Sequence, residues 1–131
     1  MEGPKTGRCL IDTNILVDHF RNVPVATDFI LSERKKSKIW ISTITLAEIF
    51  SGKMMADARV RARVIRFLGL FRVAAVDGRI AVVAGTIVRM HKAALPDALI
   101  AATALVRECR LYTRNLKRFE SIENLAVMAP F

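Results

Sequence analysis

The first regular element predicted in this chain is a short apolar run that stops at an acid. Residues 9–11 are Cys, Leu and Ile, and Asp12, Thr13 and Asn14 follow them at once. An unbroken apolar run of this length is typical of a strand buried on both faces of a parallel sheet. Asp12 then lies at the carboxyl end of that strand, where open α/β sheets bind ligands. A simpler interpretation is that Asp12 only helps to start a helix that Asn14 caps.

Short apolar segments alternate with helical patterns along the whole chain. Strands are predicted at residues 8–12, 39–41, 73–76, 111–113 and 125–128, and helices at 14–21, 24–32, 46–50, 56–70, 78–92 and 98–106. Such alternation favours an α/β fold, in which helices cover both faces of a parallel sheet. With right-handed crossovers and strand one at the centre, the predicted strand order is 3-2-1-4-5. The switch point, where a site is expected, then falls between strands one and four.

The composition fits one domain. The chain has 131 residues, of which 53% are hydrophobic, too many for a disordered protein. We expect a single domain over residues 1–131, with residues 1–7 as a loose tail. No apolar run is long enough to span a bilayer, and no apolar segment follows Lys5 as a secretory signal would require. We therefore expect a cytoplasmic protein whose Cys9 and Cys109 are free thiols.

The charge is strongly positive. The chain has 21 Lys and Arg residues against 12 Asp and Glu residues, a net charge of +9. Such a domain attracts polyanions, of which nucleic acid is the commonest, although a basic surface can also serve solubility alone. Several of the cations follow one another in residues 34–38, at the end of a predicted helix. This run could touch phosphate, but cations also suit a solvated helix end.

The predicted topology brings four oxygen-bearing side chains to one end of the sheet. Asp12 ends strand one, Asp97 opens a helix that is apolar almost all round, Glu48 follows strand two, and Asn115 follows strand four. Three carboxylates in one pocket repel, so they must take up protons or bind a divalent cation. Ligands that are all oxygen suit Mg²⁺ or Mn²⁺, which can activate water against a phosphodiester. A basic domain around an acidic pocket is the arrangement that a metal nuclease needs.

These blocks of residues resemble a PIN domain of the VapC toxin type, from bacterial toxin–antitoxin pairs. The likeness spans nearly the whole chain after the tail, and the block at 95–104, Leu-Pro-Asp-Ala-Leu-Ile-Ala-Ala-Thr-Ala, is highly specific. The other matching segments are residues 10–14, 41–48, 113–119 and 125–131. The resemblance implies a three-layer PIN-like fold with a mostly parallel five-stranded sheet. It also implies an Mg²⁺-dependent endoribonuclease that cuts structured or single-stranded RNA.

The resemblance also assigns roles to single residues. Asp12 and Asp97 would be metal ligands, Glu48 would complete the acidic cluster directly or through water, and Asn115 would be the fourth polar residue of the catalytic set. The expected supporting hydroxyls are Thr13 and Thr113. Where the family often has an acid, this chain has Arg118. That departure predicts at most one tightly held metal at rest. The cations that could contact phosphate are Arg114, Lys117 and Arg118.

The family likeness further implies partners. They are a homodimer mate, an RNA substrate, and a small antitoxin whose tail occupies the active-site groove, with the helical hairpin at residues 46–70 as its clamp. A second hypothesis keeps the fold but not the chemistry: Arg118 would mark a weakened site, and the protein would bind RNA or a partner without cutting. A nucleotide-binding α/β domain is disfavoured because no Gly-rich phosphate loop follows strand one.

Overall fold

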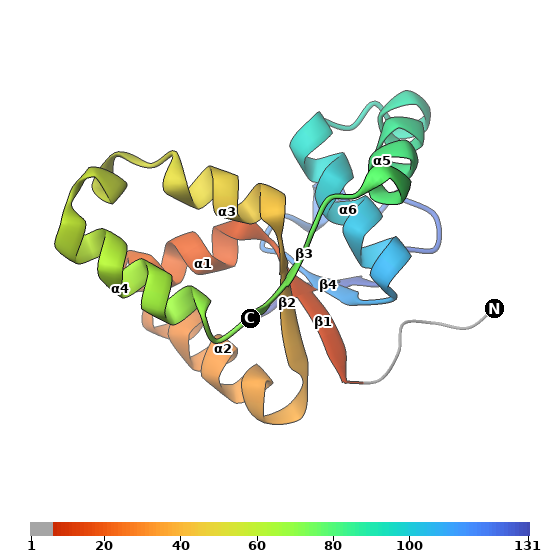
Figure 1. Ribbon diagram of the computed structural model, residues 1–131. Coiled ribbons are helices and arrows are strands. Elements are labelled where there is room, and N and C mark those ends of the chain that lie inside the picture. The colour runs from red at the N-terminus through yellow and green to blue at the C-terminus, as the bar shows by residue number, and fades with distance from the viewer. Residues whose placement is uncertain (1–6) are drawn as a thin grey trace.

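The computed structural model describes residues 7–131, so the predicted loose tail at residues 1–7 lies, apart from Gly7, outside the described residues. Five strands form one all-parallel sheet in the order β3-β2-β1-β4-β5, which confirms the predicted topology (Figure 1). The strands are β1 (Arg8–Ile11), β2 (Lys38–Ser42), β3 (Arg72–Ala74), β4 (Arg110–Tyr112) and β5 (Val127–Met128).

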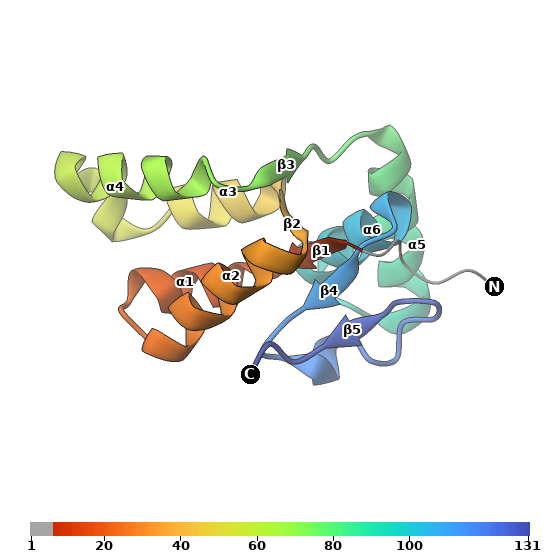
Figure 2. The same cartoon turned by 90° about the horizontal axis from the view of Figure 1, so that it is seen from below.

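Helices cover both faces of the sheet, as the alternating pattern predicted. They are α1 (Thr13–Phe20), α2 (Pro24–Lys36), α3 (Thr43–Phe50), α4 (Ala58–Leu68), α5 (Gly78–His91) and α6 (Leu95–Arg107), with short 3₁₀ helices η1 (Lys53–Ala56) and η2 (Leu116–Arg118). Figures 1 and 2 show α1–α4 on one side of the sheet and α5 and α6 on the other. Within residues 7–131 no helix is both long and apolar enough to cross a membrane.

Strand β1 lies at the centre of the molecule because its side chains divide between two cores. Cys9 and Ile11 are fully buried in the cluster that α1–α4 cover, whereas Leu10 is fully buried in the cluster that α5 and α6 cover. An apolar residue at every position, without alternation, is what a strand covered on both faces requires. Cys9 and Cys109 are both buried free thiols, and burial raises the pKa of Cys9 to about 12.

Two helix starts differ from the prediction because other side chains cap them. The Asp12 carboxylate accepts a hydrogen bond from the Thr13 N–H at 2.8 Å, so α1 begins at Thr13 and the predicted Asn14 cap is wrong. The Ser42 hydroxyl accepts from the Ile44 N–H at 3.1 Å, so α3 begins at Thr43 rather than at residue 46. A cap lies one residue before its helix and satisfies an unpaired N–H of the first turn.

Several other helices and strands begin or end at residues different from those predicted. The helix predicted at 24–32 continues to Lys36, so its cations lie within the last turn. The helix predicted at 56–70 divides into η1 and α4, because Asp57 caps α4 by accepting from the N–H groups of Arg59 and Val60. Strand β3 ends at Ala74, before the predicted end at 76, and the Val76 N–H donates instead to the Thr43 hydroxyl at 3.1 Å. Strand β5 is shorter than predicted as well.

Candidate active site

A polar pocket of about 250 Å³ lies at the carboxyl end of β1, among the first turns of α1 and α6 and the side of α3. Its lining residues are Asp12, Thr13, Asn14, Val17, Glu48, Pro96, Asp97, Ile100, Arg114 and Arg118. The three carboxylates predicted from far-apart positions in the sequence therefore line one pocket. This pocket is next to the boundary between β1 and β4, the switch point of the sheet.

Asp12 is the buried acid of this pocket. Its side chain belongs to a residue only 8% exposed, and each of its two oxygens accepts one hydrogen bond. Oδ1 accepts from the Thr13 N–H and Oδ2 from the Thr113 hydroxyl, each at 2.8 Å. Burial raises the pKa of Asp12; these two hydrogen bonds oppose the rise, and the nearby Asp97 and Glu48 add to it. The pocket thus disfavours the negative charge of Asp12 unless a cation compensates for it.

Thr13 connects Glu48 to the base of the pocket. The Thr13 hydroxyl donates to Glu48 Oε1 at 2.6 Å and lies 2.9 Å from the hydroxyl of the buried Thr45. Glu48 is otherwise exposed, so this contact is what orients its carboxylate. Thr13 and Thr113 therefore each hold an acid of the pocket in place, and their supporting role in catalysis stays a prediction.

Asp97 lies in the first turn of α6, where the helix dipole stabilises its charge. The guanidinium of Arg118 faces it, with Nη1 3.7 Å from Asp97 Oδ1. The Arg118 side chain is 60% exposed and that of Asp97 only 18%. At this distance the contact is an ion pair without a short hydrogen bond, and Arg118 is free to move toward solvent.

Three of the predicted site residues do not line the pocket: Thr113, Asn115 and Lys117. Asn115 precedes η2, and its backbone N–H donates to the Thr113 hydroxyl at 3.0 Å. Lys117 is exposed in η2. Arg114 does reach the pocket, but its Nε is 2.5 Å from Asp18 Oδ2, which already neutralises it. The catalytic role of Asn115 and the phosphate contact of Lys117 stay predictions.

The model of the PIN domain family matches residues 9–125. This chain belongs to the PIN domain family. Ribonuclease VapC10 of Mycobacterium tuberculosis is 36% identical over 121 residues, which cover 88% of this chain and 89% of that protein. The predicted family and the α/β fold with order 3-2-1-4-5 are therefore confirmed.

Solved structures agree with this membership. A toxin-antitoxin complex from Klebsiella pneumoniae contains a chain that is 31% identical, with a TM-score of 0.81 over 94% of this chain and 98% of that one. DNA-bound VapBC from Salmonella typhimurium contains a chain 26% identical, with a TM-score of 0.81 over 95% of this chain and 98% of that one. Both likenesses extend over nearly the whole PIN domain.

Sequence analysis missed a pocket residue of this PIN domain. Asn14, interpreted as a helix cap, instead lines the pocket, and its buried Oδ1 has no hydrogen-bond partner in the structure. Asp18, the partner of Arg114, was also missed. Asn14 and Asp18 are separated by four residues, which places them on one face of α1. The spacing of four between these two polar residues was the signal that could have found both.

The donor set of the pocket fits a hard cation. Carboxylate oxygens come from Asp12, Glu48 and Asp97, and the unpartnered Asn14 Oδ1 is a further oxygen in the same lining. Within residues 7–131 no three His, Cys, Asp or Glu side chains are grouped so as to hold one ion together. Mg²⁺ commonly keeps several waters and takes one or two protein carboxylates, which is what such a pocket offers.

Proposed function

We propose that this chain is a metal-dependent endoribonuclease, the toxin of a toxin–antitoxin pair, that hydrolyses RNA phosphodiester bonds with Mg²⁺, or Mn²⁺ in its place. The observation that carries the proposal is the buried Asp12, whose pKa is raised by burial and by the neighbouring Asp97 and Glu48 in one pocket. The net charge of +9 over the whole chain favours a polyanionic substrate. Membership of the PIN family and the likeness to a ribonuclease support the same chemistry.

In this proposal Asp12 and Asp97 hold the metal, and Thr113 keeps Asp12 oriented through its hydrogen bond. The bound metal would supply Lewis acidity toward the phosphate and lower the pKa of a coordinated water. Glu48, held by the Thr13 hydroxyl, stands at the exposed side of the pocket and can accept a proton from an incoming water. Arg118 lines the same pocket and offers a guanidinium to a phosphate oxygen.

The second hypothesis, an RNA- or protein-binding module without chemistry, keeps the same fold. It requires that Arg118 has made the site ineffective. We favour the nuclease because Asp12, Glu48 and Asp97 all line the pocket and because Arg118 is exposed enough to leave Asp97. One assay of RNA binding and cleavage distinguishes the two hypotheses.

The test is cleavage of a mixed RNA pool by purified protein without antitoxin, in Mg²⁺ and in excess chelator. Asp12→Asn and Asp97→Asn should each reduce cutting by roughly 10²-fold or more. Asp77→Asn is the matched control, because Asp77 caps α5, does not line the pocket, and has an N–H contact that Asn can keep. RNA that is bound but left intact by the wild-type protein would favour the binding module. Cutting that persists in the chelator would overturn the metal-dependent mechanism.

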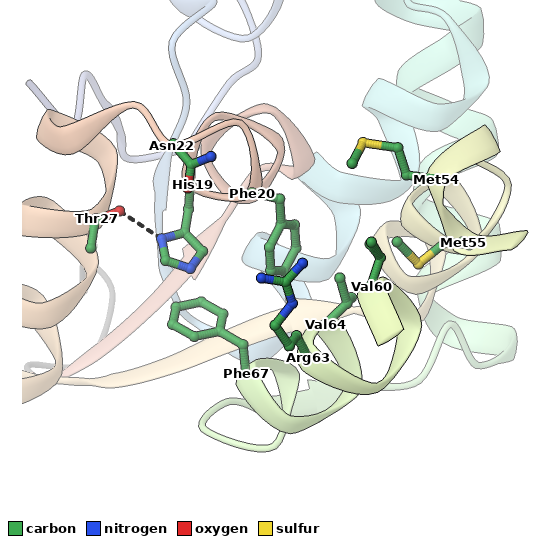
Figure 3. A pocket seen from close by; sticks show the side chains of 10 residues that line it. All are labelled: His19, Phe20, Asn22, Thr27, Met54, Met55, Val60, Arg63, Val64 and Phe67. Atoms are coloured by element: carbon green, nitrogen blue, oxygen red, sulfur yellow. Dashed lines mark hydrogen bonds between the residues drawn. The ribbon is translucent and has the colours of Figure 1, made fainter. Parts of the chain in front are cut away.

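We also propose that the antitoxin docks on an apolar hollow of about 480 Å³ between α1, α2, η1 and α4 (Figure 3). Met54, Met55 and Phe67 line it, and Met54 is 62% exposed. His19 forms one wall: its ring stacks on Phe67 with centroids 3.9 Å apart, and its Nδ1 lies 2.7 Å from the Thr27 hydroxyl. Burial lowers the pKa of His19, so this wall is neutral at physiological pH.

A candidate antitoxin co-expressed with this chain should stop RNA cleavage, and Met54→Glu should restore cleavage by weakening the complex. Met90→Glu is the matched control, since Met90 is 65% exposed on α5 and does not line this hollow. Equal inhibition of all three proteins would place the antitoxin elsewhere. The homodimer and the cytoplasmic location stay predictions; light scattering of the purified protein tests the first.

A further inference from the structure

The end of the sheet opposite the pocket carries a cluster of cations around a hollow of about 470 Å³. Besides Gly7 and Ser37, its lining consists of Arg8, Arg34, Lys35, Lys36 and Lys38, which we call the amino-end cradle. These residues come from three elements: the start of β1, the last turn of α2, and the start of β2. No acidic side chain within residues 7–131 lines this hollow.

Helix electrostatics explain only part of the cradle. Arg34, Lys35 and Lys36 lie in the last turn of α2, where cations stabilise the C-terminal end of the dipole. Arg8 and Lys38 lie on strands, so a helix dipole does not explain why cations occupy these two positions. Cations from all three elements nevertheless face the same hollow.

Arg8 and Lys38 are register partners across the parallel β1–β2 pair. Like charges directly opposite each other on neighbouring strands destabilise a sheet. Glu33, an acid on α2, is buried and engaged elsewhere, because it accepts from the Ser37 hydroxyl at 2.6 Å and pairs with Arg110 at 3.6 Å. The repulsion therefore has no compensating carboxylate among the residues that line the hollow, and an external anion would relieve it.

Arg8 is also held in a fixed position. Its Nη1 donates to the Arg107 carbonyl at 3.1 Å, and the Lys38 N–H donates to the Gly7 carbonyl at 2.8 Å. The floor of the hollow is thus anchored, while Lys35, Lys36 and Lys38 are exposed around it. A fixed guanidinium surrounded by exposed ammonium groups is suited to a chain of phosphates, since several charges can each contact one phosphate.

We propose that the amino-end cradle is a second binding site for the phosphodiester backbone of the RNA substrate, remote from the pocket where cutting takes place. The proposal rests on the proposed nuclease function for the identity of the polyanion. Arg8 and Asp12 are four positions apart along the strand, about 13 Å, and the sheet between them is covered by helices. One RNA reaches both sites only by running around the surface, so the cradle selects long RNA over short.

The binding test uses the full chain with Asp97→Asn, in which any cleavage by the wild-type protein should be reduced roughly 10²- to 10³-fold. In this background we compare Lys35→Gln/Lys36→Gln/Lys38→Gln with a control of equal charge loss, Arg79→Gln/Arg89→Gln/Lys92→Gln, three exposed cations on or next to α5. For a long unstructured RNA, the cradle variant should bind roughly 10- to 100-fold more weakly, and its log Kd against log salt should lose about 2 in slope. Equal losses in cradle and control variants would overturn the proposal.

The cutting test uses the same triple variants with Asp97 intact. The cradle variant should raise KM for the long RNA and leave kcat unchanged, and it should cut a short oligonucleotide like the wild-type protein. Equal loss on short and long RNA would assign the cations to the active site and overturn the proposal. If the protein binds long RNA through the cradle but cuts nothing, the nuclease function fails and the cradle stands. If it cuts RNA and the cradle variant is unaffected, the cradle fails alone.

Discussion

The two ends of one sheet carry opposite charges. At the carboxyl ends of the strands Asp12, Glu48 and Asp97 line a pocket; at the amino ends the cradle cations surround a hollow. Helix direction accounts for part of this division, because α1 and α6 begin at the acidic end and α2 ends at the basic end. It does not account for the burial of Asp12 or for the facing Arg8 and Lys38. Charged side chains that the helix dipoles do not explain mark the places where we expect ligands to bind.

The largest effect expected is on cutting. Asp97→Asn removes one charge from the proposed metal site but keeps the size of the side chain, so RNA cleavage should fall roughly 10²- to 10³-fold, the usual cost of losing one charge-stabilising group in an active site. Steady-state cleavage in Mg²⁺ measures the loss, and circular dichroism checks the fold. A variant that remains folded and cuts at the wild-type rate would show that the acidic end is only a set of helix starts.

Asp12→Asn should increase the stability of the metal-free protein at neutral pH, although it should reduce cleavage. Because burial raises the pKa of Asp12, the metal-free wild-type protein gains stability from this group at acid pH and loses it as pH rises from the unfolded pKa to the higher folded one. Asn carries no charge, so the variant should be the more stable protein at neutral pH in chelator. Its advantage should shrink below the unfolded pKa of Asp.

Thermal melts of both proteins in chelator at neutral and at acid pH measure this difference. Mg²⁺ should then raise the melting temperature of the wild-type protein and leave Asp12→Asn unchanged. A variant less stable than the wild type at neutral pH would mean that its hydrogen bonds to Thr13 and Thr113 outweigh the buried charge.

Asp77 provides the contrast of an acid that is only structural. Its carboxylate accepts from the Ile80 N–H at 2.9 Å and lines neither charged site. Asp77→Ala should cost about 1 kcal/mol of unfolding free energy through the lost cap, without changing kcat or KM. Urea unfolding and cleavage assays measure the two quantities. A change in cleavage would contradict the separation between capping acids and pocket acids.

Sequence patterns predicted the sheet order and the meeting of Asp12, Glu48 and Asp97. Buried strands are visible as local apolar runs, and crossovers between parallel strands are right-handed in nearly all proteins. The sequence predictions were wrong where a side chain could form either of two local contacts. Asn14 was expected to cap a helix, yet Asp12 does so and Asn14 lines the pocket. Four cradle cations lie in the run at residues 34–38 that the sequence already shows, but only the β1–β2 register places Arg8 beside them.

The smallest effect expected concerns Arg118, a cation that lines the acidic pocket. Arg118 pairs with Asp97 across 3.7 Å, so a metal that binds Asp97 must first displace or repel this guanidinium. Arg118→Ala should therefore bind Mn²⁺ more tightly in the absence of RNA, by up to about fivefold, since the pair is largely exposed and such pairs are weak. Calorimetric titration of RNA-free protein measures the affinity, and Arg118→Lys, which keeps the charge, should stay closer to the wild type.

Unchanged affinity in Arg118→Ala would mean that Arg118 does not compete with the metal. Two tight Mn²⁺ sites in the wild-type protein would show that replacing the family's usual acid with Arg118 did not remove the second metal position.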